Sequence, residues 1–555
     1  MAPASDIDLF APFEQDTILE IRTSKMKQMP GLKIETGIDK NMRSGRIPVS
    51  FVGLDADEHD LTFHGGPDKA IHGYCCSHYQ TWQTEFPEAA ARFQRGGFGE
   101  NFVTARMNER NVCIGDIVSV GNDGVLLQVS LPRQPCFKLN HRFQLKNFAP
   151  NTYRTSRTGW YYRVLHEGTV QAGDEIRLVE RRWPKWTIER VQEYLHRTLD
   201  DAAMNEELAS IMDMGDESRK AFETRVTKLK AKQKKLAAGS GEKETETWRD
   251  YKIVEKKPQT PRITSFILEA TQPDPDDADA LKPGSHVRLR LPNGLTRSYS
   301  IVSGSRDRFE LGIALEAPSR GGSAYLHGQA NEGDVLQVGR MTTDVKPAGA
   351  ASTHVFIVGG IGITAFLPLV EKYRRINWET MVHYGVRSAA DVPFRERVVD
   401  GLGDSLRLYD AQQGRRMDVP AIFRGLSWNS HVYVCGPSRL MEEAVREARR
   451  SGLGEDEVHF EAFAADTSGD PFEVEVRNRG GRVLKIGEEE TLLEVLREHF
   501  DDVPSSCEVG NCGTCRVALK CGKVEHRGTA LMDEEKDEAM LSCVSRGVGR
   551  IVIEV

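Results

Sequence analysis

The chain has 555 residues, of which 39% are hydrophobic and 28% are charged, and its formal net charge at pH 7 is −8. This length predicts roughly three to five domains. The charge lacks the basic footprint of a nucleic-acid-binding protein, and no apolar run approaches the ~20 residues that cross a membrane. The N-terminus carries neither a secretory nor a transit pattern. Most of the ten cysteines are not spaced as pairs, which fits a reducing compartment. We therefore expect a cytoplasmic protein.

Residues 1–181 combine β-prone runs and turns with three unusual polar stretches. These are H-G-G-P-D-K-A-I-H at 64–72, G-G-F-G-E-N at 96–101 and P-R-Q-P-C-F-K at 132–138. In the third, prolines on both sides of Arg133 fix the backbone before Cys136. Taken singly, a His/Lys loop is usually exposed surface, and a proline-flanked cysteine is usually a buried small hydrophobe.

Three further cysteines of this part are expected to be packing residues. Cys75 and Cys76 follow the first stretch in H-G-Y-C-C-S-H-Y-Q-T-W, which favours a helix, and Cys113 lies in N-V-C-I-G-D on an expected alternating strand. We do not assign these thiols to a ligand.

Taken together with R-T-G-W-Y-Y-R-V at 157–164 and V-x-x-G-D at 170–174, the three stretches resemble the MOSC domain, and within it the bacterial YiiM branch. The resemblance implies a β-barrel-like domain over 1–181 that binds a molybdenum cofactor (Mo-molybdopterin), with Cys136 as metal ligand and catalytic residue. A soft thiolate suits such a metal, and charge-assisted hydrogen bonds would offset the burial of the pterin phosphate. The implied cofactor-binding residues are His64, Gly65, Gly66, Asp68, Lys69, His72, Gly99, Glu100, Asn101 and Arg133, and the proton donor stays open among His64, His72 and Glu100.

Residues 182–228 resemble the three-helix appendix that follows MOSC in the YiiM branch. Thr187 is the expected N-cap of its first helix, with Ile188, Val191 and Leu195 on one face. The composition changes at 226–247, which is Lys-rich, then rich in Ala, Gly and Ser, and then in Glu and Thr. Such a charge run is usually a solvated helix end followed by a flexible linker, and we place the linker at 229–247.

Residues 248–350 alternate short β-prone runs with Gly, Pro, Asn and Asp turns, which predicts a small antiparallel barrel. One strand carries a guanidinium, an aromatic ring and hydroxyls on neighbouring positions, and a later Gly-Gly-Ser supplies N–H groups at an expected helix start, where an anion is favoured. Each segment is weak alone, but in this order they are a strong signal. They consist of Arg297, Ser298, Tyr299 and Ser300, and of Gly321, Gly322 and Ser323.

Residues 351–465 contain a strand, a glycine-rich turn with Gly360 and Gly362, and helical periodicity from Thr364 onward. Such a turn holds a pyrophosphate on the N–H groups of a helix N-terminus. The acidic residue expected at the end of the next strand is absent, since that strand ends at Arg387. A further strand ends at Cys435, at the edge where open α/β sheets bind ligands.

Residues 466–555 contain cysteines in the spacing C-x4-C-x2-C, with a fourth 27 residues later, which is typical of a plant-type [2Fe–2S] cluster. The ligands would be Cys507, Cys512, Cys515 and Cys543. Zinc usually takes its ligands from two C-x2-C pairs, and disulfides do not explain the glycines between these cysteines. The spacing therefore favours an iron–sulfur cluster and a redox protein.

Residues 248–555 resemble the ferredoxin–NADP reductase superfamily in the arrangement of phthalate dioxygenase reductase. The resemblance implies an antiparallel flavin-binding β-barrel (248–350), an α/β NAD(P)-binding domain (351–465) and a β-grasp [2Fe–2S] ferredoxin domain (466–555). Arg297, Ser298, Tyr299 and Ser300 would hold the flavin, and Gly321, Gly322 and Ser323 its phosphate. Gly360, Gly362, Thr364, Arg387, Cys435, Gly436 and Pro437 would line the nicotinamide site. The resemblance favours FMN over FAD and NADH over NADPH, although Arg387 is a candidate partner for a 2′-phosphate.

The fold class is therefore multidomain, α/β plus β. We interpret the chain as a self-sufficient molybdoenzyme that passes electrons from NAD(P)H through FMN and [2Fe–2S] to the molybdenum cofactor. The family implies small N-hydroxylated substrates: hydroxylaminopurines, amidoximes and hydroxamic acids. Two alternatives remain. MOSC is a carrier or sulfur-transfer module, or the reductase serves an external oxygenase. No nucleic-acid or membrane partner is expected, and the sequence leaves a homodimer open.

Overall fold

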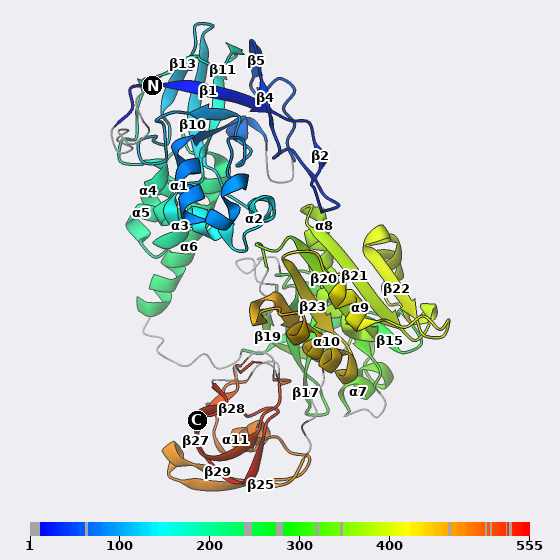
Figure 1. Cartoon of the computed structure of the whole chain (residues 1–555). Coiled ribbons are helices and arrows are strands. Elements are labelled where there is room, and N and C mark those ends of the chain that lie inside the picture. Colours follow the sequence, from blue (N-terminus) through cyan, green and yellow to red (C-terminus); the bar gives the residue numbers. More distant parts are fainter. Residues whose placement is uncertain are drawn as a thin grey trace.

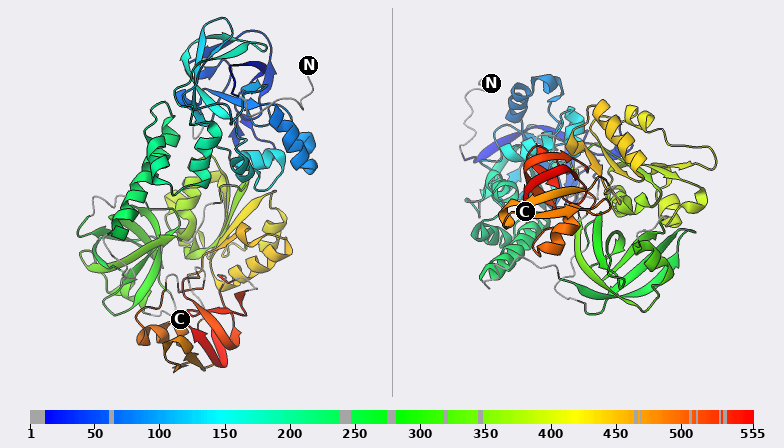
Figure 2. Two further views of the ribbon diagram at one scale, coloured as in Figure 1. Left: turned by 90° about the vertical axis from the view of Figure 1, so that its left-hand side faces the viewer. Right: turned by 90° about the horizontal axis from the view of Figure 1, so that it is seen from below.

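The structure is a computed structural model. It describes residues 12–60, 65–237, 247–273, 281–316, 321–343, 348–463, 467, 469–505, 508–510, 513–528, 530–531 and 535–555. Figures 1 and 2 show the N-terminal domain at one end of the molecule, the C-terminal sheet at the other, and the barrel and parallel sheet between them. No helix among these residues is long and apolar enough to cross a membrane.

The N-terminal domain is an eight-stranded sheet in the order β13-β9-β10-β11-β7-β8-β1-β4, which the pairing of β13 with β1 closes into a barrel. Alternating residues such as Val118 and Val120 on β9 point into its core and are fully buried. The strands are β1 (Gln15–Thr23), β4 (Asn41–Arg43), β7 (Ile71–Cys75), β8 (Phe102–Thr104), β9 (Ile117–Val120), β10 (Val125–Pro132), β11 (Trp160–His166) and β13 (Glu175–Glu180). The short strands β2 (Lys27–Gln28), β3 (Glu35–Thr36), β5 (Ile47–Ser50), β6 (Gly53–Leu54) and β12 (Gly168–Val170) lie outside this sheet.

Helices accompany this barrel and follow it. They are α1 (Ser77–Glu85), α2 (Phe137–Phe143) and α3 (Phe148–Thr155), and then α4 (Ile188–Gln192), α5 (Ala202–Ala209) and α6 (Asp216–Ala237). Thr187 caps α4 as expected, since its side chain accepts a hydrogen bond from the N–H of Arg190. Helix α6 continues through Ala237, so the start of the segment expected as linker at 229–247 is helical.

The second barrel is closed and antiparallel, in the order β14-β15-β18-β17-β16-β19, as the turn pattern predicts. Its strands are β14 (Arg249–Pro258), β15 (Ile263–Ala270), β16 (Ser285–Arg290), β17 (Thr296–Gly304), β18 (Arg308–Ala314) and β19 (Val335–Thr343), and α7 (Gly322–Gly328) lies between β18 and β19 along the chain.

A five-stranded parallel sheet follows, in the order β22-β21-β20-β23-β24, with β20 (Thr353–Gly359) at its centre. Its other strands are β21 (Glu379–Val386), β22 (Leu406–Asp410), β23 (Ser430–Cys435) and β24 (Val458–Phe460), and its helices are α8 (Ile363–Arg375), α9 (Val419–Arg424) and α10 (Ser438–Arg450). The last sheet has the order β26-β25-β29-β27-β28 and packs on α11 (Leu492–His499). Its strands are β25 (Phe472–Val476), β26 (Arg482–Ile486), β27 (Arg516–Glu525), β28 (Ala539–Leu541) and β29 (Arg546–Glu554). The predicted fold class is confirmed.

Helix α2 joins the N-terminal domain to the parallel sheet. Asn140 Nδ2 donates to the carbonyl of Ala350 at 2.9 Å, and His141 Nδ1 lies 3.1 Å from Ser352 Oγ, directly before β20 begins. The ring of Phe137 meets that of Trp378 edge-on at 6.0 Å. The N-terminal domain therefore contacts the amino edge of the sheet, opposite the edge that carries the glycine-rich turn.

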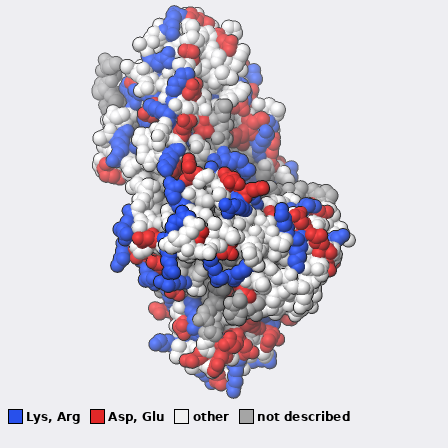
Figure 3. Space-filling model, turned by 90° about the vertical axis from the view of Figure 1, so that its right-hand side faces the viewer, with Lys and Arg blue, Asp and Glu red and all other residues white. Residues whose placement is uncertain are grey.

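Charged side chains of both signs alternate over the face shown in Figure 3, and no extended basic patch covers it. This mixture of signs reflects the similar numbers of basic and acidic residues in the chain, 74 Lys and Arg against 82 Asp and Glu.

Candidate functional site

The polar stretches of the N-terminal domain converge where β7 and β10 meet the turn before β8. The N–H of His72 donates to Asn101 Oδ1 at 3.0 Å, and Arg133 Nη2 donates to the carbonyl of Phe98 at 3.3 Å. Arg133 also donates its backbone N–H to Gly159 at 3.0 Å. These contacts bring one imidazole and one guanidinium of the predicted set together.

Two buried nitrogen atoms in this cluster lack a hydrogen-bond partner among the described residues. They are His72 Nε2 and Arg133 Nη1, on side chains that are 3% and 4% exposed. Burial, reinforced by the nearby Arg133 charge, holds the pKa of His72 well below its usual range, so the imidazole is neutral. Buried polar groups without partners are rare and point to a missing ligand or water. A cation beside a neutral imidazole fits an anionic ligand.

Cys136 is the N-cap residue of α2 and is partly exposed. Cys75 and Cys113 are buried, and burial raises the pKa of both thiols, that of Cys113 to about 12. Burial and the neighbouring Cys136 also raise the pKa of Tyr153, whose hydroxyl donates to the carbonyl of Pro135. Cys136 is thus a partly exposed thiol close to Arg133 in sequence, and both residues influence the pKa of the Tyr153 and Tyr161 phenols.

The helix expected over Cys75 and Cys76 is wrong in its first part. Cys75 ends strand β7, which pairs with β11 and β8, and α1 begins only at Ser77. Cys113 lies in a turn that makes one isolated bridge with Thr187, outside any strand. Cys75 and Cys113 nevertheless pack in the interior, as expected.

Several residues of the expected cofactor set are engaged within the protein. Glu100 is fully buried, and its carboxylate accepts from Tyr79 Oη and the Gly96 N–H, both at 2.6 Å, which makes it a structural brace for its own turn. Asn101 Nδ2 donates to Asp57 at 2.8 Å. Gly99 has φ 73° and no room for a Cβ, which would lie 2.7 Å from Ile38.

The first polar loop turns toward α6. Asp68 accepts from Arg163 Nε at 2.8 Å and from the N–H of Asp216 at 3.0 Å, and Lys69 pairs with Glu217. Gly65 and Gly66 have φ values of 85° and 81°, which glycine adopts without strain. His64 lies outside the described residues.

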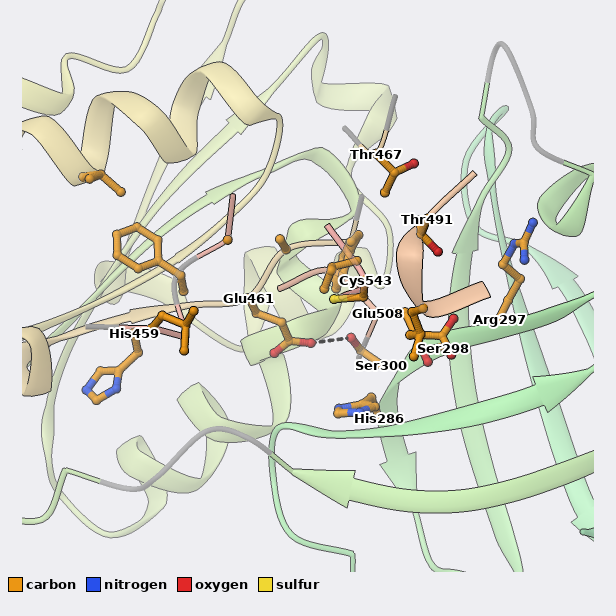
Figure 4. Close-up of a pocket in the computed structure, with 18 of the residues that line it drawn as sticks. His286, Arg297, Ser298, Ser300, His459, Glu461, Thr467, Thr491, Glu508 and Cys543 are labelled. Carbon is orange, nitrogen blue, oxygen red and sulfur yellow. Dashed lines mark hydrogen bonds between the residues drawn. The ribbon is translucent and has the colours of Figure 1, made fainter. Parts of the chain in front are cut away.

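A second candidate site is a cavity of about 710 Å³ between the second barrel, the parallel sheet and the last sheet (Figure 4). Its lining includes Arg297, Ser298, Tyr299 and Ser300 of β17 together with Cys543, one of the expected cluster ligands. Ser300 Oγ donates to Glu461 Oε1 at 2.9 Å, and burial raises the pKa of Tyr299. The strand expected to hold the flavin and one expected cluster ligand, Cys543, therefore line the same cavity.

The expected phosphate segment lies beside this strand. Gly321 is the N-cap of α7 with φ 91°, and Ser323 Oγ accepts from the N–H of Glu316 at 3.3 Å. A Cβ on Gly322 would lie 2.8 Å from Arg297 Cγ. Glycine at this position lets the backbone approach the Arg297 side chain closely.

The glycine-rich turn after β20 meets the end of β23. A Cβ on Gly362 would lie 2.4 Å from the carbonyl oxygen of Cys435 and 3.1 Å from its sulfur, and a Cβ on Gly436 would lie 3.1 Å from the N–H nitrogen of Gly359. Burial, and then the charge of Glu461, holds the pKa of Cys435 well above its usual range, so this thiol is neutral.

The remaining residues of the expected nicotinamide set lie around this turn. Thr364 is buried and donates to the carbonyl of Ile361 at 2.8 Å, within its own turn, so its hydroxyl is engaged. Pro437 precedes α10, and Arg387 is exposed after β21.

Cys515 and Cys543 bring their sulfur atoms within 3.1 Å of each other, close enough to bind one metal ion. Cys507 and Cys512 lie outside the described residues. Gly510 has φ 81°, and a Cβ there would lie 2.8 Å from Gly528. Glu508 accepts from Arg288 Nη2 of the second barrel at 3.3 Å, and this contact links the cysteine loop to the barrel.

Sequence reasoning missed three residues that the fold brings to these sites. Glu461 follows the short strand β24 and reaches Ser300, 161 positions away. Glu217, at the start of α6, reaches Lys69. Tyr161 is buried near both Arg133 and Cys136, whose charges influence its pKa, although burial is the main cause that raises it. Of the three, Tyr161 alone carried a signal, as part of the W-Y-Y-R segment.

Comparison with known proteins supports both halves. The MOSC domain family matches residues 60–177, and the 2Fe-2S iron-sulfur cluster binding domain family matches residues 476–547. A reductase of Gibberella moniliformis is 35% identical over 570 residues, which cover 99% of this chain and 97% of that protein. The phthalate 4,5-dioxygenase oxygenase reductase subunit of Pseudomonas putida is 31% identical over 301 residues, covering 52% of this chain and 91% of that protein.

Among solved structures, YiiM from Geobacillus stearothermophilus is 31% identical, with a TM-score of 0.33, and the match covers 38% of this chain and 99% of that one. The relationship to the Gibberella reductase extends over nearly the whole chain. The chain belongs to the family of that reductase, and it is an oxidoreductase that joins a MOSC domain to a phthalate dioxygenase reductase-like module with a C-terminal [2Fe–2S] domain.

Proposed function

We propose that the chain is a self-sufficient reductase of N-hydroxylated compounds, in which NADH, FMN and a [2Fe–2S] cluster supply electrons to a molybdenum cofactor at Cys136. The observation that carries the proposal is a pair of buried nitrogens, His72 Nε2 and Arg133 Nη1, that lack a hydrogen-bond partner among the described residues. Tyr161 connects them to the partly exposed thiol of Cys136, since its ring lies 5.2 Å from that of His72 and the charges of both Arg133 and Cys136 influence its pKa. Conversion of N–OH to N–H and water takes two electrons and two protons, which one hydride equivalent and one further proton provide.

The residues of the MOSC site fit the proposed group by their chemistry. Arg133 would bind an anionic group, His72 would meet it as a neutral imidazole, and the Cys136 thiolate would bind a soft metal. When bound, the molybdenum cofactor supplies a metal that accepts the oxygen of the N–OH group. Because the Glu100 carboxylate is engaged within its own turn, we favour His72 over Glu100 as the polar group that faces the substrate.

The test measures metal content and two activities of the full chain. Wild type should contain molybdenum at about one atom per chain and should reduce an amidoxime with NADH. Cys136→Ala should lose amidoxime reduction and keep NADH–cytochrome c reduction, because flavin and cluster lie in other domains. Cys76→Ala, which alters a half-buried thiol of the same domain, should keep both activities. Amidoxime reduction by Cys136→Ala at the wild-type rate would refute the proposal.

A second candidate function is the reduction of an external oxygenase. It is favoured by the position of the last sheet, which lies at the opposite end of the molecule from the MOSC domain (Figure 1). The Pseudomonas putida relative is named as a reductase subunit of a dioxygenase. Under this function, the wild-type chain would hold no molybdenum and would not reduce amidoximes, yet it would still reduce cytochrome c.

A further inference from the structure

A carboxylate of the helical appendix lies on the polar loop of the MOSC site. Glu217, in the first turn of α6, pairs with Lys69 of the loop; the Lys69 side chain is 14% exposed and that of Glu217 is 47% exposed. Lys69 is one of the cations expected to meet a phosphate. A carboxylate and a phosphate compete for the same ammonium group, since both are oxygen anions.

The start of α6 is fixed over this loop by backbone contacts. The N–H of Asp216 donates to Asp68 Oδ2 at 3.0 Å, and the N–H of Gly215 donates to the carbonyl of Ser130 at 2.7 Å. Ser130 lies near the end of β10, which leads directly into Arg133 and Cys136. Glu217 is therefore held near the thiol segment by the same contacts that position the helix.

The thiol segment also contacts a phenol, since Tyr153 Oη donates to the carbonyl of Pro135, directly before Cys136. Burial is the main cause that raises the pKa of Tyr153 and of Tyr161; Cys136 and Glu217 raise both further, and Arg133 opposes them. The Glu217 carboxylate, the Cys136 thiol and the Arg133 guanidinium thus all influence the pKa of the same two phenols. Arg133 Nη1 remains without a partner in this cluster among the described residues, which independently points to an absent anion.

We propose that Glu217 is the gate of the Cys136 site: its carboxylate occupies Lys69 until the phosphate group of a phosphorylated ligand displaces it. The inference rests on the proposed anionic ligand at Cys136 and adds a residue of the appendix to that site. Displacement breaks the Lys69–Glu217 pair while the backbone contacts of Gly215 and Asp216 remain, so occupancy of the site removes one contact between the loop and the appendix.

The test compares Glu217→Gln with Glu223→Gln in the full chain and uses inorganic phosphate as the probe. Glu223 is a matched control, because it lies on the same helix, is 46% exposed and pairs with Arg219 at 2.7 Å away from the loop. Glu217→Gln should bind phosphate about fivefold more tightly than wild type, the scale of a half-exposed ion pair. Glu223→Gln should bind as wild type does. Adding Lys69→Met to Glu217→Gln should remove the gain.

Calorimetric titration gives the affinities, and the molybdenum content after dialysis identifies the source of the phosphate. If Glu217→Gln raises both phosphate affinity and molybdenum retention, the phosphate belongs to the cofactor. If it raises phosphate affinity alone, the phosphate belongs to the substrate. Phosphate affinity that is equal in wild type and Glu217→Gln, or absent from both, overturns the gate, whether or not Cys136→Ala abolishes amidoxime reduction. A gain in phosphate affinity without amidoxime reduction in wild type keeps the gate and refutes the proposed reaction.

Discussion

The turn after β20 allows a test of the nicotinamide site, because its two glycines are needed for different reasons: Gly362 for lack of space and Gly360 for its backbone conformation. Gly362 has an ordinary helical φ of −57°, but a Cβ there would lie 2.4 Å from the Cys435 carbonyl oxygen, well below the 3.0 Å that real contacts respect. Gly360 has φ 54° and open space around it. Alanine at Gly362 therefore forces β23 and the turn apart by about 0.6 Å.

We expect Gly362→Ala to destabilise this domain by about 1–3 kcal/mol, the usual cost of overpacking. Gly360→Ala should cost about 1–2 kcal/mol through its left-handed backbone alone. Because displacements of about 1 Å at a reacting centre can slow a reaction roughly 100-fold, Gly362→Ala should lower kcat/KM for flavin reduction by NADH toward that extent. Gly360→Ala should change it less. Anaerobic stopped-flow spectroscopy measures the rate, and wild-type values of kcat/KM and Tm for Gly362→Ala would refute the steric argument.

Three further predictions follow from other contacts. Cys543→Ser should lose iron and cytochrome c reduction but keep NADH–ferricyanide reduction, because hydride transfer involves only the barrel and the parallel-sheet domain; equal loss of both would refute this carrier order. Arg288→Ala removes the contact between the second barrel and Glu508, which then keeps only its pair with Arg497 of the last domain among the contacts described. It should slow cluster reduction more at low salt than at high salt, as stopped-flow traces at two ionic strengths would show. Burial lowers the pKa of His459 to about 4, so the unfolded chain takes up a proton below pH 6.5 that the folded chain excludes. The free energy of unfolding should fall from pH 6.5 toward 4, and His459→Gln should weaken that dependence in urea titrations.

The sequence predicted best those features that depend on local pattern. The glycines around Gly362 and the strand that ends at Cys435 indicated a parallel sheet with a ligand-binding edge, and β20 and β23 pair as such a sheet requires. Thr187 capped its helix because a hydroxyl before an apolar periodic segment stabilises a helix start wherever the helix lies. Neither feature needed tertiary information.

Tertiary contacts decided the features that the sequence missed. The segment around Cys75 favoured a helix by its sequence, but pairing with β11 and β8 made it a strand. Glu461 is an ordinary surface-type residue in the sequence, and only the packing of three domains around one cavity brings it to Ser300. The same holds for Glu100, which looked like an available carboxylate because the sequence does not show that the backbone of its own turn and the distant Tyr79 hydroxyl donate to it.

The arrangement of the domains bears on how electrons would reach Cys136. Cys136 lies at the start of helix α2, which contacts the amino edge of the parallel sheet through Asn140 and His141. Cys543 instead lines the cavity that also contains the strand expected to bind the flavin. Electron transfer weakens steeply with distance, so the last domain, with its cluster, has to leave the cavity, or a second chain has to accept its electrons, for the proposed reaction to run. Cross-linking Arg288→Cys to Glu508→Cys tests this directly. The cross-link should preserve flavin-to-cluster transfer and abolish amidoxime reduction, and full amidoxime reduction by the cross-linked protein would show that the domain does not need to move.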